Sequence, residues 1–256
     1  MLEVRHVAKQ FGGLRALSDI SFKVEKDQTV GIIGPNGAGK TTAFNVVTGT
    51  LKPTEGQIFL AGQEITGLAP SKVVSLGLAR TFQQTTIYAN ETVEENVRRG
   101  TIWRLQGSIL KGLLPQSSSR RAAMAADMAN VDEIIETLGL QSVRDRVAGT
   151  LSYGLQKKVG VAIGLATRPK LLLMDEPAAG LNSQESHEFG ELITIIKQRY
   201  NLTVLLVEHH IALVRRISSK IIVIAQGRVI AEGAPDEVLS NPQVIESYLG
   251  TRNAEG

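Results

Sequence analysis

The chain has 256 residues, a length that suits one large domain or two small ones. Hydrophobic residues make up 43% of it and charged residues 21%, so it can bury a core and is not an intrinsically disordered chain. The net charge of +3 is too small to indicate a nucleic-acid partner, and the absence of cysteine excludes disulfides, thiol nucleophiles and thiolate metal sites.

No apolar stretch approaches the roughly 18 to 20 residues that a membrane-spanning helix needs. The sequence begins Met1-Leu2-Glu3, without the basic start and apolar run of a signal peptide. We therefore expect a soluble, cytoplasmic protein, in which any role at a membrane comes through a partner.

The first third of the chain is predicted to be rich in β-structure. Two segments alternate apolar and polar residues as half-buried strands do, and a third is continuously apolar, as in a strand covered on both faces. A fourth segment with an Ala61-Gly62 turn predicts a short hairpin. The predicted strands are Leu2–Val7, Ile20–Val24, Thr29–Ile33 and Gln57–Leu60.

The middle of the chain, from about Glu91 to Leu165, has helical spacing of its apolar residues. The residues that carry this spacing are Val93, Val97, Met124, Met128, Val131, Ile134, Ile135 and Leu138. Between them Gly107–Arg121 is a basic stretch with Gly, Ser and Pro, which we interpret as a surface loop or a short helix.

From Lys170 onward, strands and helices alternate. The predicted elements are strand Leu171–Met174, helix Ser183–Tyr200, strand Thr203–Val207, helix Ile211–Ile217 and strand Ile221–Ala225. The whole pattern indicates an α/β core interrupted by a mostly helical insertion.

A phosphate-binding loop is the strongest motif. The run from Gly34 to Thr42 satisfies G-x-x-x-x-G-K-[ST], a buried strand precedes it, and a helix is predicted from Thr41 to Val47. Backbone N–H groups of such a loop surround phosphate oxygens, Lys40 reaches the β and γ phosphates, and the Thr41 hydroxyl ligates Mg²⁺. The predicted nucleotide-binding residues are Gly34, Asn36, Gly37, Ala38, Gly39, Lys40, Thr41 and Thr42.

Two acids follow the buried strand Leu171–Met174. A carboxylate in that place lies at the carboxyl edge of the sheet, where open α/β folds bind ligands. Asp175 therefore fits the acid that organises Mg²⁺ in a nucleotidase, and Glu176 fits the general base that activates water. A solvated acidic turn before Pro177 is the structural alternative.

The segment Leu151-Ser152-Tyr153-Gly154-Leu155-Gln156 resembles the LSGGQ signature of ABC transporter ATP-binding subunits, with Tyr153 and Leu155 departing from it. Ser152 and Gly154, at a helix N-terminus, can form a second anion site. The resemblance covers nearly the whole chain. It implies a P-loop NTPase (RecA-like) core with an antiparallel β subdomain and an inserted helical subdomain. It also implies that Ser152 and Gly154 face the ATP held by a second subunit.

Further positions resemble motifs of that family in the expected order. Phe11 lies where the family stacks an aromatic on adenine, and a core or edge aromatic is the structural alternative. Gln83 occupies the Q-loop position, with Gln84 as its rival, and would ligate Mg²⁺ or the attacking water. His209 matches the histidine that contacts the γ-phosphate, and its neighbour His210 would point elsewhere.

The run Ala179-Gly180-Leu181-Asn182 corresponds to the D-loop of the family. Asn182 with Glu185 also fits a helix N-cap and its N3 acid, which is a sufficient structural reason for both. His6 and His187 lack such a context and are expected at the surface or at an edge.

We predict a single domain over residues 1–256, with a core lobe of about 1–86 and 167–256 and a helical subdomain of about 87–166. The Ala79–Gln83 run, Val207-Glu208-His209 and the ending Asn241–Gly250 resemble the branch that takes up branched-chain (hydrophobic or amide) amino acids. Urea-uptake and lipopolysaccharide-export ATPases share parts of these motifs and stay as alternatives.

The resemblance implies an ATPase that dimerises around ATP and drives a membrane permease. Its partners would be integral permease subunits docked near Gln83–Asn90, an identical or similar ATP-binding subunit and, indirectly, an external substrate-binding protein. It would lie peripherally on the cytoplasmic side of the inner or plasma membrane. A soluble ATPase acting on DNA or the ribosome is the rival, but the space between Lys40 and Asp175 holds only a compact insertion and the charge is mild. A non-hydrolysing regulatory subunit is disfavoured by Glu176 and His209.

Overall fold

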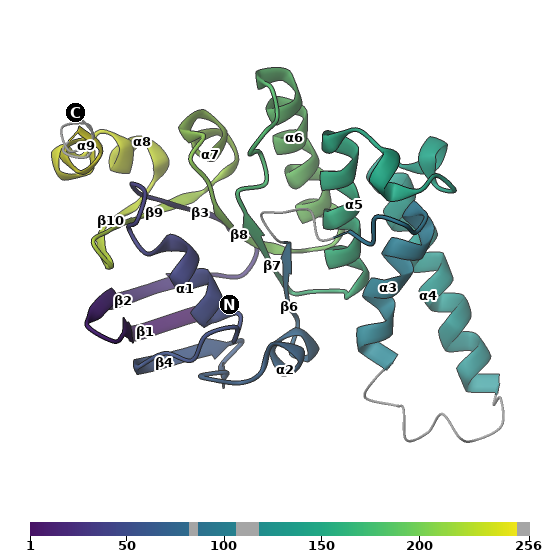
Figure 1. Cartoon of the computed structure of the whole chain (residues 1–256), viewed down its shortest axis with the longest axis horizontal. Coiled ribbons are helices and arrows are strands. Elements are labelled where there is room, and N and C mark those ends of the chain that lie inside the picture. The colour runs from purple at the N-terminus through teal and green to yellow at the C-terminus, as the bar shows by residue number, and fades with distance from the viewer. Residues whose placement is uncertain (82–86, 106–117, 250–256) are drawn as a thin grey trace.

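The computed structural model describes residues 1–81, 87–105 and 118–249. Its centre is a ten-stranded mixed sheet with the strand order β5-β4-β1-β2-β10-β9-β3-β8-β7-β6 (Figure 1). Helices lie on both sides of the parallel part of this sheet (Figure 1). The α/β fold class expected from the sequence is confirmed.

An antiparallel group of strands occupies one end of the sheet. It comprises β1 (Leu2–Phe11), β2 (Leu14–Val24), β4 (Glu55–Leu60) and β5 (Gln63–Glu64). The first two strands are longer than predicted, because β1 and β2 stay paired up to the turn, where Phe11 lies opposite Leu14. Near the turn, apolar and polar residues no longer alternate, so the sequence pattern did not extend that far. The hairpin with the Ala61-Gly62 turn is confirmed.

Parallel strands form the other part of the sheet. The strand β3 (Thr29–Ile33) lies between β8 (Thr203–Val207) and β9 (Lys220–Ala225), and β7 (Leu171–Asp175) pairs with β8. Every residue of β3, β7 and β8 is buried. The continuous apolar runs therefore form strands covered on both faces, as the sequence predicts.

Alternate residues of each central strand enter different cores. Ile32 and Leu205 pack with Phe44 of α1 (Lys40–Val47), on one side of the sheet. Ile33 and Leu206 pack on the other side. That side is covered by helices α5 (Tyr153–Ala166), α6 (Ser183–Arg199) and α7 (Ile211–Ile217). Because side chains alternate across a strand, each central strand joins both cores.

Beyond α5 lies the helical part of the chain (Figure 1). It contains α3 (Val93–Leu105), α4 (Ser118–Thr137) and the short 3₁₀ turns η2 (Gln141–Val143) and η3 (Ala148–Thr150). Of the basic stretch Gly107–Arg121, the residues from Ser118 are the start of α4, and those before it lie outside the described residues. The division into lobes near residues 87 and 166 stays a prediction.

Several short elements were not predicted. They are α2 (Pro70–Ser75), β6 (Leu78–Thr81), β10 (Arg228–Gly233), α8 (Pro235–Leu239) and α9 (Pro242–Leu249). Each has four to eight residues. In the described part of the chain, no helix has both the length and the apolar character needed to cross a membrane.

A capping box begins α6. Asn182 accepts a hydrogen bond from the Glu185 N–H at 2.9 Å, and the Glu185 carboxylate accepts one from the Asn182 N–H at 2.9 Å. Both N–H groups would otherwise lack a helical partner. The structural interpretation of this pair is therefore confirmed.

We expect Asn182→Ala to lower the free energy of unfolding by about 1 kcal/mol, because the cap bond to Glu185 is lost. Urea unfolding followed by circular dichroism measures this change. The control is Gln184→Ala in the same turn, whose side chain donates a hydrogen bond to the exposed Glu188. Equal stability of the Asn182 variant and the wild type would show that the cap contributes nothing.

Candidate active site

The loop between β3 and α1 has the backbone that a phosphate cradle needs. Gly34, Gly37 and Gly39 all have positive φ, at 153°, 75° and 101°. A Cβ atom on Gly34 would lie 2.0 Å from the Ile224 carbonyl oxygen, whereas one on Gly37 would meet nothing within 4 Å. The loop is thus packed against the sheet at one glycine and open to a ligand at another.

Lys40 is folded back onto this loop. Its Nζ donates to the carbonyl oxygens of Gly34 at 2.7 Å and Pro35 at 2.8 Å, and the residue is 6% exposed. Burial lowers the pKa of Lys40, while the charges of Glu176 and Asp175 act in the opposite direction. The structure therefore brings the predicted lysine and both predicted acids together. Phosphate oxygens can replace the two carbonyl oxygens as partners of the ammonium group.

The other predicted residues of the loop differ in their exposure. Asn36 and Thr41 are exposed, Thr42 is half-buried at the start of α1, and Ala38 is buried. The helix N-terminus adds its partial positive charge at the same place. The arrangement suits an anion.

Asp175 ends β7 with one oxygen paired and the other unpaired. Its Oδ2 accepts a hydrogen bond from the Arg80 guanidinium at 2.5 Å, and Arg80 also donates to Asn45 of α1 at 2.6 Å. The Oδ1 atom is buried and has no hydrogen-bond partner among the described residues. Since buried polar atoms are nearly always satisfied, this oxygen fits a Mg²⁺ ion or one of its water ligands.

Glu176 and His209 meet at the carboxyl edge of the sheet. The Nε2 atom of His209 lies 3.0 Å from Oε1 of Glu176. Glu176 has a φ of 48° and donates its N–H to the Val207 carbonyl at 2.9 Å. Because Asp175 pairs with Val207 in the parallel ladder, the residues that follow each strand emerge side by side.

His210 points elsewhere, as predicted. Its Nδ1 lies 2.9 Å from the Ser186 hydroxyl of α6. The remaining histidines are exposed: His6 lies near Asp19, and His187 near Glu191 on the same helix.

The signature segment lies at the exposed N-terminus of α5. Ser152 is the N-cap, but its side chain makes no capping hydrogen bond, so its hydroxyl is not used within the helix. Tyr153 is 44% exposed and lies over Gly180, where an added Cβ would come within 2.8 Å of the ring. Gly154 lies in the first turn, with Glu185 and Leu181 as its nearest neighbours. Ser152 is thus exposed and Gly154 half-buried, and their predicted role toward a second subunit stays a prediction.

The roles predicted for Gln83 and Phe11 stay predictions, as do those of the other site residues. Gln83 and its rival Gln84 lie outside the described residues. Phe11 is 44% exposed, with the Lys9 ammonium 4.9 Å from its ring centre, so an exposed face remains for stacking.

Three charged residues of the site were not predicted. Arg80 holds Asp175, Lys157 donates to the Glu176 carbonyl at 3.1 Å, and Glu208 accepts hydrogen bonds from the loops on either side of it. All three are largely buried: the Arg80 side chain is 9% exposed, Lys157 6% and Glu208 2%. A charged residue directly after the apolar run Thr203–Val207 is the sequence signal for Glu208, whereas Lys157 stands between Gln156 and Lys158 and has no such signal.

These features define an ATP-binding cassette of the P-loop class, and comparison with known proteins agrees. Residues 17–179 match the family model described as ABC transporter. The chain therefore belongs to the ABC transporter family, as an ATP-binding cassette ATPase. Residues 228–254 match a second model, described as branched-chain amino acid ATP-binding cassette transporter. The family resemblance of the sequence is confirmed.

Two curated relatives align over almost the whole chain. The chain is 42% identical to the high-affinity branched-chain amino acid transport ATP-binding protein BraF of Pseudomonas aeruginosa, covering 98% of both chains. It is 40% identical to LivG of Escherichia coli, a protein of the same description, with the same coverage. These relatives do not favour the alternative transporter branches or an ATPase acting on nucleic acid.

Solved structures of ATP-binding cassettes have the same fold. The ADP conformation of MJ1267, a cassette of an ABC transporter, superposes with a TM-score of 0.82 at 34% identity, covering 98% of both chains. A dimeric post-hydrolysis state of the cassette MJ0796 with ADP and Pi gives 0.74 at 25% identity, covering 92% of this chain and 99% of that one.

We expect Lys40→Ala to raise the dissociation constant of ATP at least about tenfold, because hydrogen bonds to charged groups contribute about 1.5–3 kcal/mol. Calorimetric titration of the purified chain measures the constant. The control is Lys26→Ala, whose side chain is 75% exposed and pairs with Asp27. Unchanged ATP affinity in the Lys40 variant would contradict the assignment of the phosphate loop.

Proposed function

We propose that this chain binds MgATP at the Gly34–Thr42 loop and hydrolyses it with Glu176 as general base. The released energy drives uptake of branched-chain or related amino acids through separate permease subunits. The observation that carries the catalytic part is the 3.0 Å contact between Glu176 and His209, beside the buried Lys40.

In this proposal the chain's residues divide the chemistry of phosphoryl transfer. Glu176 accepts a proton from the attacking water, and His209 orients both that water and the γ-phosphate. Lys40 leaves the loop carbonyls and neutralises the developing phosphate charge. Gln83, which lies outside the described residues, supplies an amide to the metal or to the water in this proposal.

The residues present fit a Mg²⁺ ion, which would neutralise phosphate charge when bound. The unpaired Oδ1 of Asp175 and the hydroxyl of Thr41 are the groups that would hold it. Among the described residues no three acidic or histidine side chains gather into a metal cage. This suits an ion that takes most of its ligands from phosphates and water.

Dimerisation with a second ATP-binding subunit is proposed from the exposure of Ser152 and Tyr153 in the signature segment. Ser152 is exposed and its hydroxyl makes no capping hydrogen bond, so we propose that it and the Gly154 N–H receive the γ-phosphate held by a partner subunit. The dimeric form of the MJ0796 cassette supports this arrangement. The partner is an identical chain or a similar ATPase, and ATP joins the two surfaces until it is hydrolysed.

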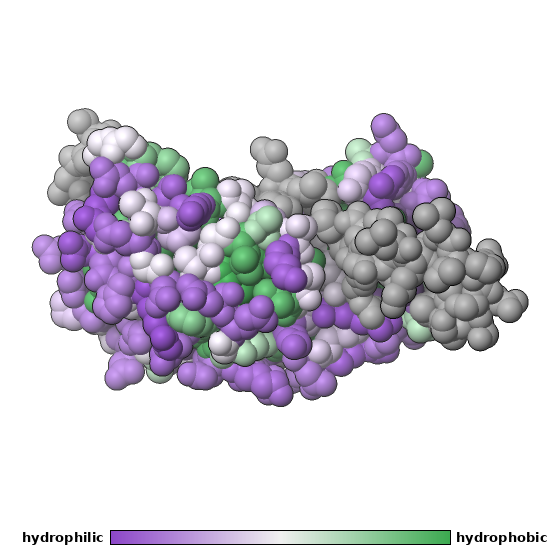
Figure 2. Space-filling view, turned by 90° about the horizontal axis from the view of Figure 1, so that it is seen from below, coloured by the Kyte–Doolittle hydropathy of each residue, from purple (hydrophilic) through white to green (hydrophobic). Residues whose placement is uncertain are grey.

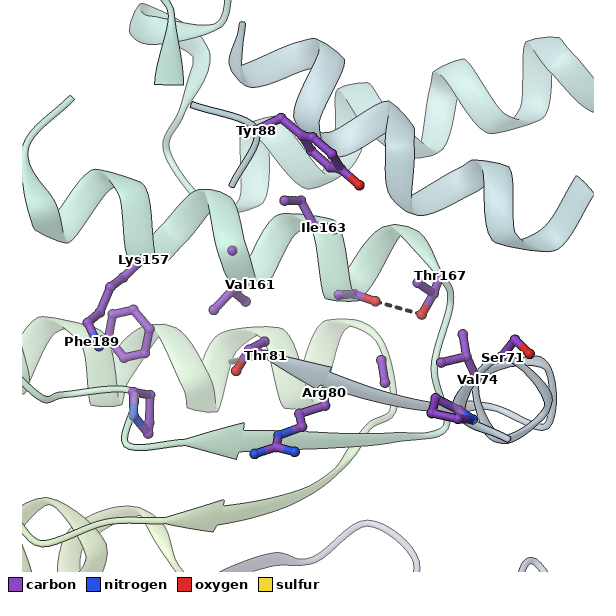
Figure 3. Close-up of a pocket in the computed structure, with 15 residues that line it drawn as sticks. Ser71, Val74, Arg80, Thr81, Tyr88, Lys157, Val161, Ile163, Thr167 and Phe189 are labelled. Carbon is purple, nitrogen blue, oxygen red and sulfur yellow. Dashed lines mark hydrogen bonds between the residues drawn. The ribbon is translucent and has the colours of Figure 1, made fainter. Parts of the chain in front are cut away.

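A pocket between the sheet and α5 is the proposed docking site for the permease. Its volume is about 330 Å³, and its walls include Pro70 of α2, Ala79 of β6, Ile163 of α5 and Phe189 of α6. Figure 3 shows Tyr88 on one side of α5 and Thr81 on the other. The molecular face seen from below, where α2 lies, has apolar residues gathered near its middle (Figure 2). A hollow of this kind accepts a short apolar or amphipathic helix.

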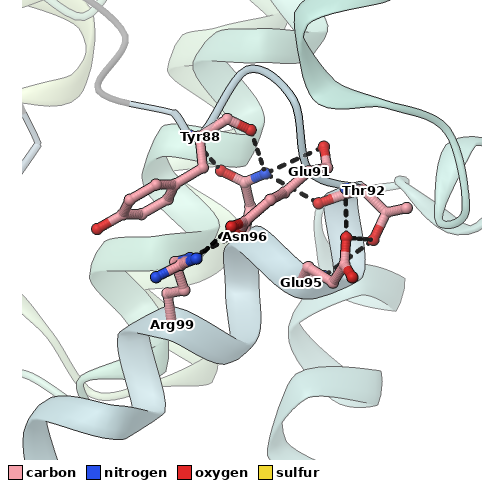
Figure 4. A network of polar contacts seen from close by, with 6 residues as sticks. All are labelled: Tyr88, Glu91, Thr92, Glu95, Asn96 and Arg99. Carbon is pink, nitrogen blue, oxygen red and sulfur yellow. Dashed lines mark hydrogen bonds and ion pairs between the residues drawn. The ribbon is translucent and has the colours of Figure 1, made fainter.

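A network of polar contacts fixes the rim of this pocket (Figure 4). The buried Asn96 side chain accepts from the Tyr88 N–H at 2.7 Å and donates to the carbonyls of Tyr88 at 3.0 Å and Thr92 at 2.9 Å. Arg99 pairs with Glu91 and lies 4.1 Å from the centre of the Tyr88 ring. Tyr88 is 47% exposed, so the network presents a rigid aromatic surface to a partner.

The substrate class in this proposal comes from the relatives, which are branched-chain amino acid transport proteins. In importers of this kind the permease and an external binding protein select the substrate. We therefore propose that the chain works with both, and that the permease holds it at the cytoplasmic side of the membrane.

We expect Glu176→Gln to lower ATP turnover by about 10²–10⁴-fold, because the amide cannot accept the proton of water. ATP-dependent association should persist, since the phosphate contacts remain. Phosphate release and analytical ultracentrifugation measure the two properties. Glu191→Gln, on the exposed face of α6, is the control. Unchanged turnover would remove Glu176 as the base.

We expect integral permease subunits to co-purify with the wild-type chain from membranes and to be lost with Tyr88→Ala, because the aromatic rim of the pocket is removed. ATP affinity should stay unchanged. The control is Ile245→Ala, an exposed apolar residue of α9. Retention of the permease by the Tyr88 variant would contradict docking at this pocket, and recovery of ribosomes or DNA would contradict the transport function.

A further inference from the structure

Glu208 is a buried acid that connects two loops of the active site. It follows β8 directly and is 2% exposed. Its Oε1 accepts a hydrogen bond from the Ala178 N–H at 2.6 Å, and its Oε2 accepts bonds from the N–H groups of His209 at 3.1 Å and His210 at 3.4 Å. One carboxylate therefore accepts hydrogen bonds from the backbone of the loop after β7 and from that of the loop after β8.

The two loops carry the two proposed catalytic groups. Ala178 is two residues after Glu176, in the loop that follows β7, and His209 begins the loop that follows β8. Glu208 also donates its own N–H to the Ile32 carbonyl of β3 at 3.3 Å, next to the start of the phosphate loop. Its side chain thus lies where the ends of three parallel strands meet.

The energetics favour a specific task for this acid. Removing a carboxylate from water costs several kcal/mol unless hydrogen bonds replace its hydration. Backbone N–H groups supply those bonds at Glu208, and bonds to an ionised acceptor are about twice as strong as neutral ones. Each oxygen serves a different loop, so a shift of either loop would leave a buried charge poorly satisfied.

We propose that Glu208 is a positioning residue for ATP hydrolysis. By holding Ala178 and His209 together, it keeps the Glu176 carboxylate and the His209 imidazole within hydrogen-bond distance while ATP, water and products exchange. This inference rests on the proposed roles of Glu176 and His209.

If the Glu208 side chain only stabilised its own loop, a shorter acid at this position would serve equally well. Bonds from Oε2 to the N–H groups of the next two residues form a local turn, which a shorter acid also makes. The bond to Ala178 crosses between loops and needs the full length of glutamate. Shortening the side chain by one C–C bond, about 1.5 Å, would stretch the 2.6 Å contact to about 4 Å, beyond hydrogen-bond range.

The test compares Glu208→Asp with Glu208→Gln in the full-length chain. Aspartate keeps the charge and the local turn but loses the bond between the loops. Glutamine keeps the length, and its single carbonyl oxygen can still accept from Ala178. If the bond between the loops matters, the Gln variant turns over ATP faster than the Asp variant.

For Glu208→Asp we expect kcat to fall about 10- to 100-fold, because misplacing catalytic groups by about 1 Å costs up to about 10²-fold. The KM for ATP and the dissociation constant of ADP should stay within about twofold, since the phosphate loop is untouched. A loss of folded protein would lower the number of nucleotide sites instead, so kcat is expressed per titrated site. Glu188→Asp, an exposed acid of α6, is the control.

Wild-type kcat in Glu208→Asp, or a Gln variant no faster than the Asp variant, would overturn the proposal. A parallel rise in the ADP dissociation constant would also overturn it, because a general loss of structure would then explain the effect. A different variant tests the proposed function, which would be contradicted if Glu176→Gln retained ATP turnover. If Glu176→Gln is inactive and Glu208→Asp is normal, only the positioning role is wrong.

Discussion

The parallel pairing of three fully buried strands is the constraint on which the site depends. Val207 of β8 lies opposite both Ile32 of β3 and Asp175 of β7, so all three strands end at one edge of the sheet. The phosphate loop, the acid pair and His209 follow these strands directly. The sheet therefore brings loops that are distant in sequence to the same place.

At that edge, buried charged groups bind the backbone or one another. Lys40 is held by two carbonyl oxygens, Asp175 by Arg80, and Glu208 by backbone N–H groups. Hydrogen bonds in a low-dielectric interior are strong and directional, so these bonds fix the positions of the active-site side chains before a ligand binds. Lys157 extends the same network from α5 to the Glu176 carbonyl, which joins the signature helix to the catalytic loop.

Much of this arrangement could be predicted because it is local in sequence. The apolar runs Thr29–Ile33 and Thr203–Val207 have the bounds expected for buried strands, and the phosphate loop follows from its spacing. The pairing of Arg80 with Asp175 could not be predicted, since the two residues are 95 positions apart and only the sheet brings them together. The role of Glu208 was missed for a related reason, because its partner Ala178 lies on a loop that follows a different strand.

A structure of the chain with Mg²⁺ and a non-hydrolysable ATP analogue tests the central claim most directly. We expect the triphosphate in the loop from Gly34 to Thr42, with the Lys40 ammonium moved from its two carbonyl partners to the β and γ phosphates. The terminal phosphate should face Glu176 and His209. Triphosphate bound elsewhere, or Lys40 still bonded only to Gly34 and Pro35, would contradict the account.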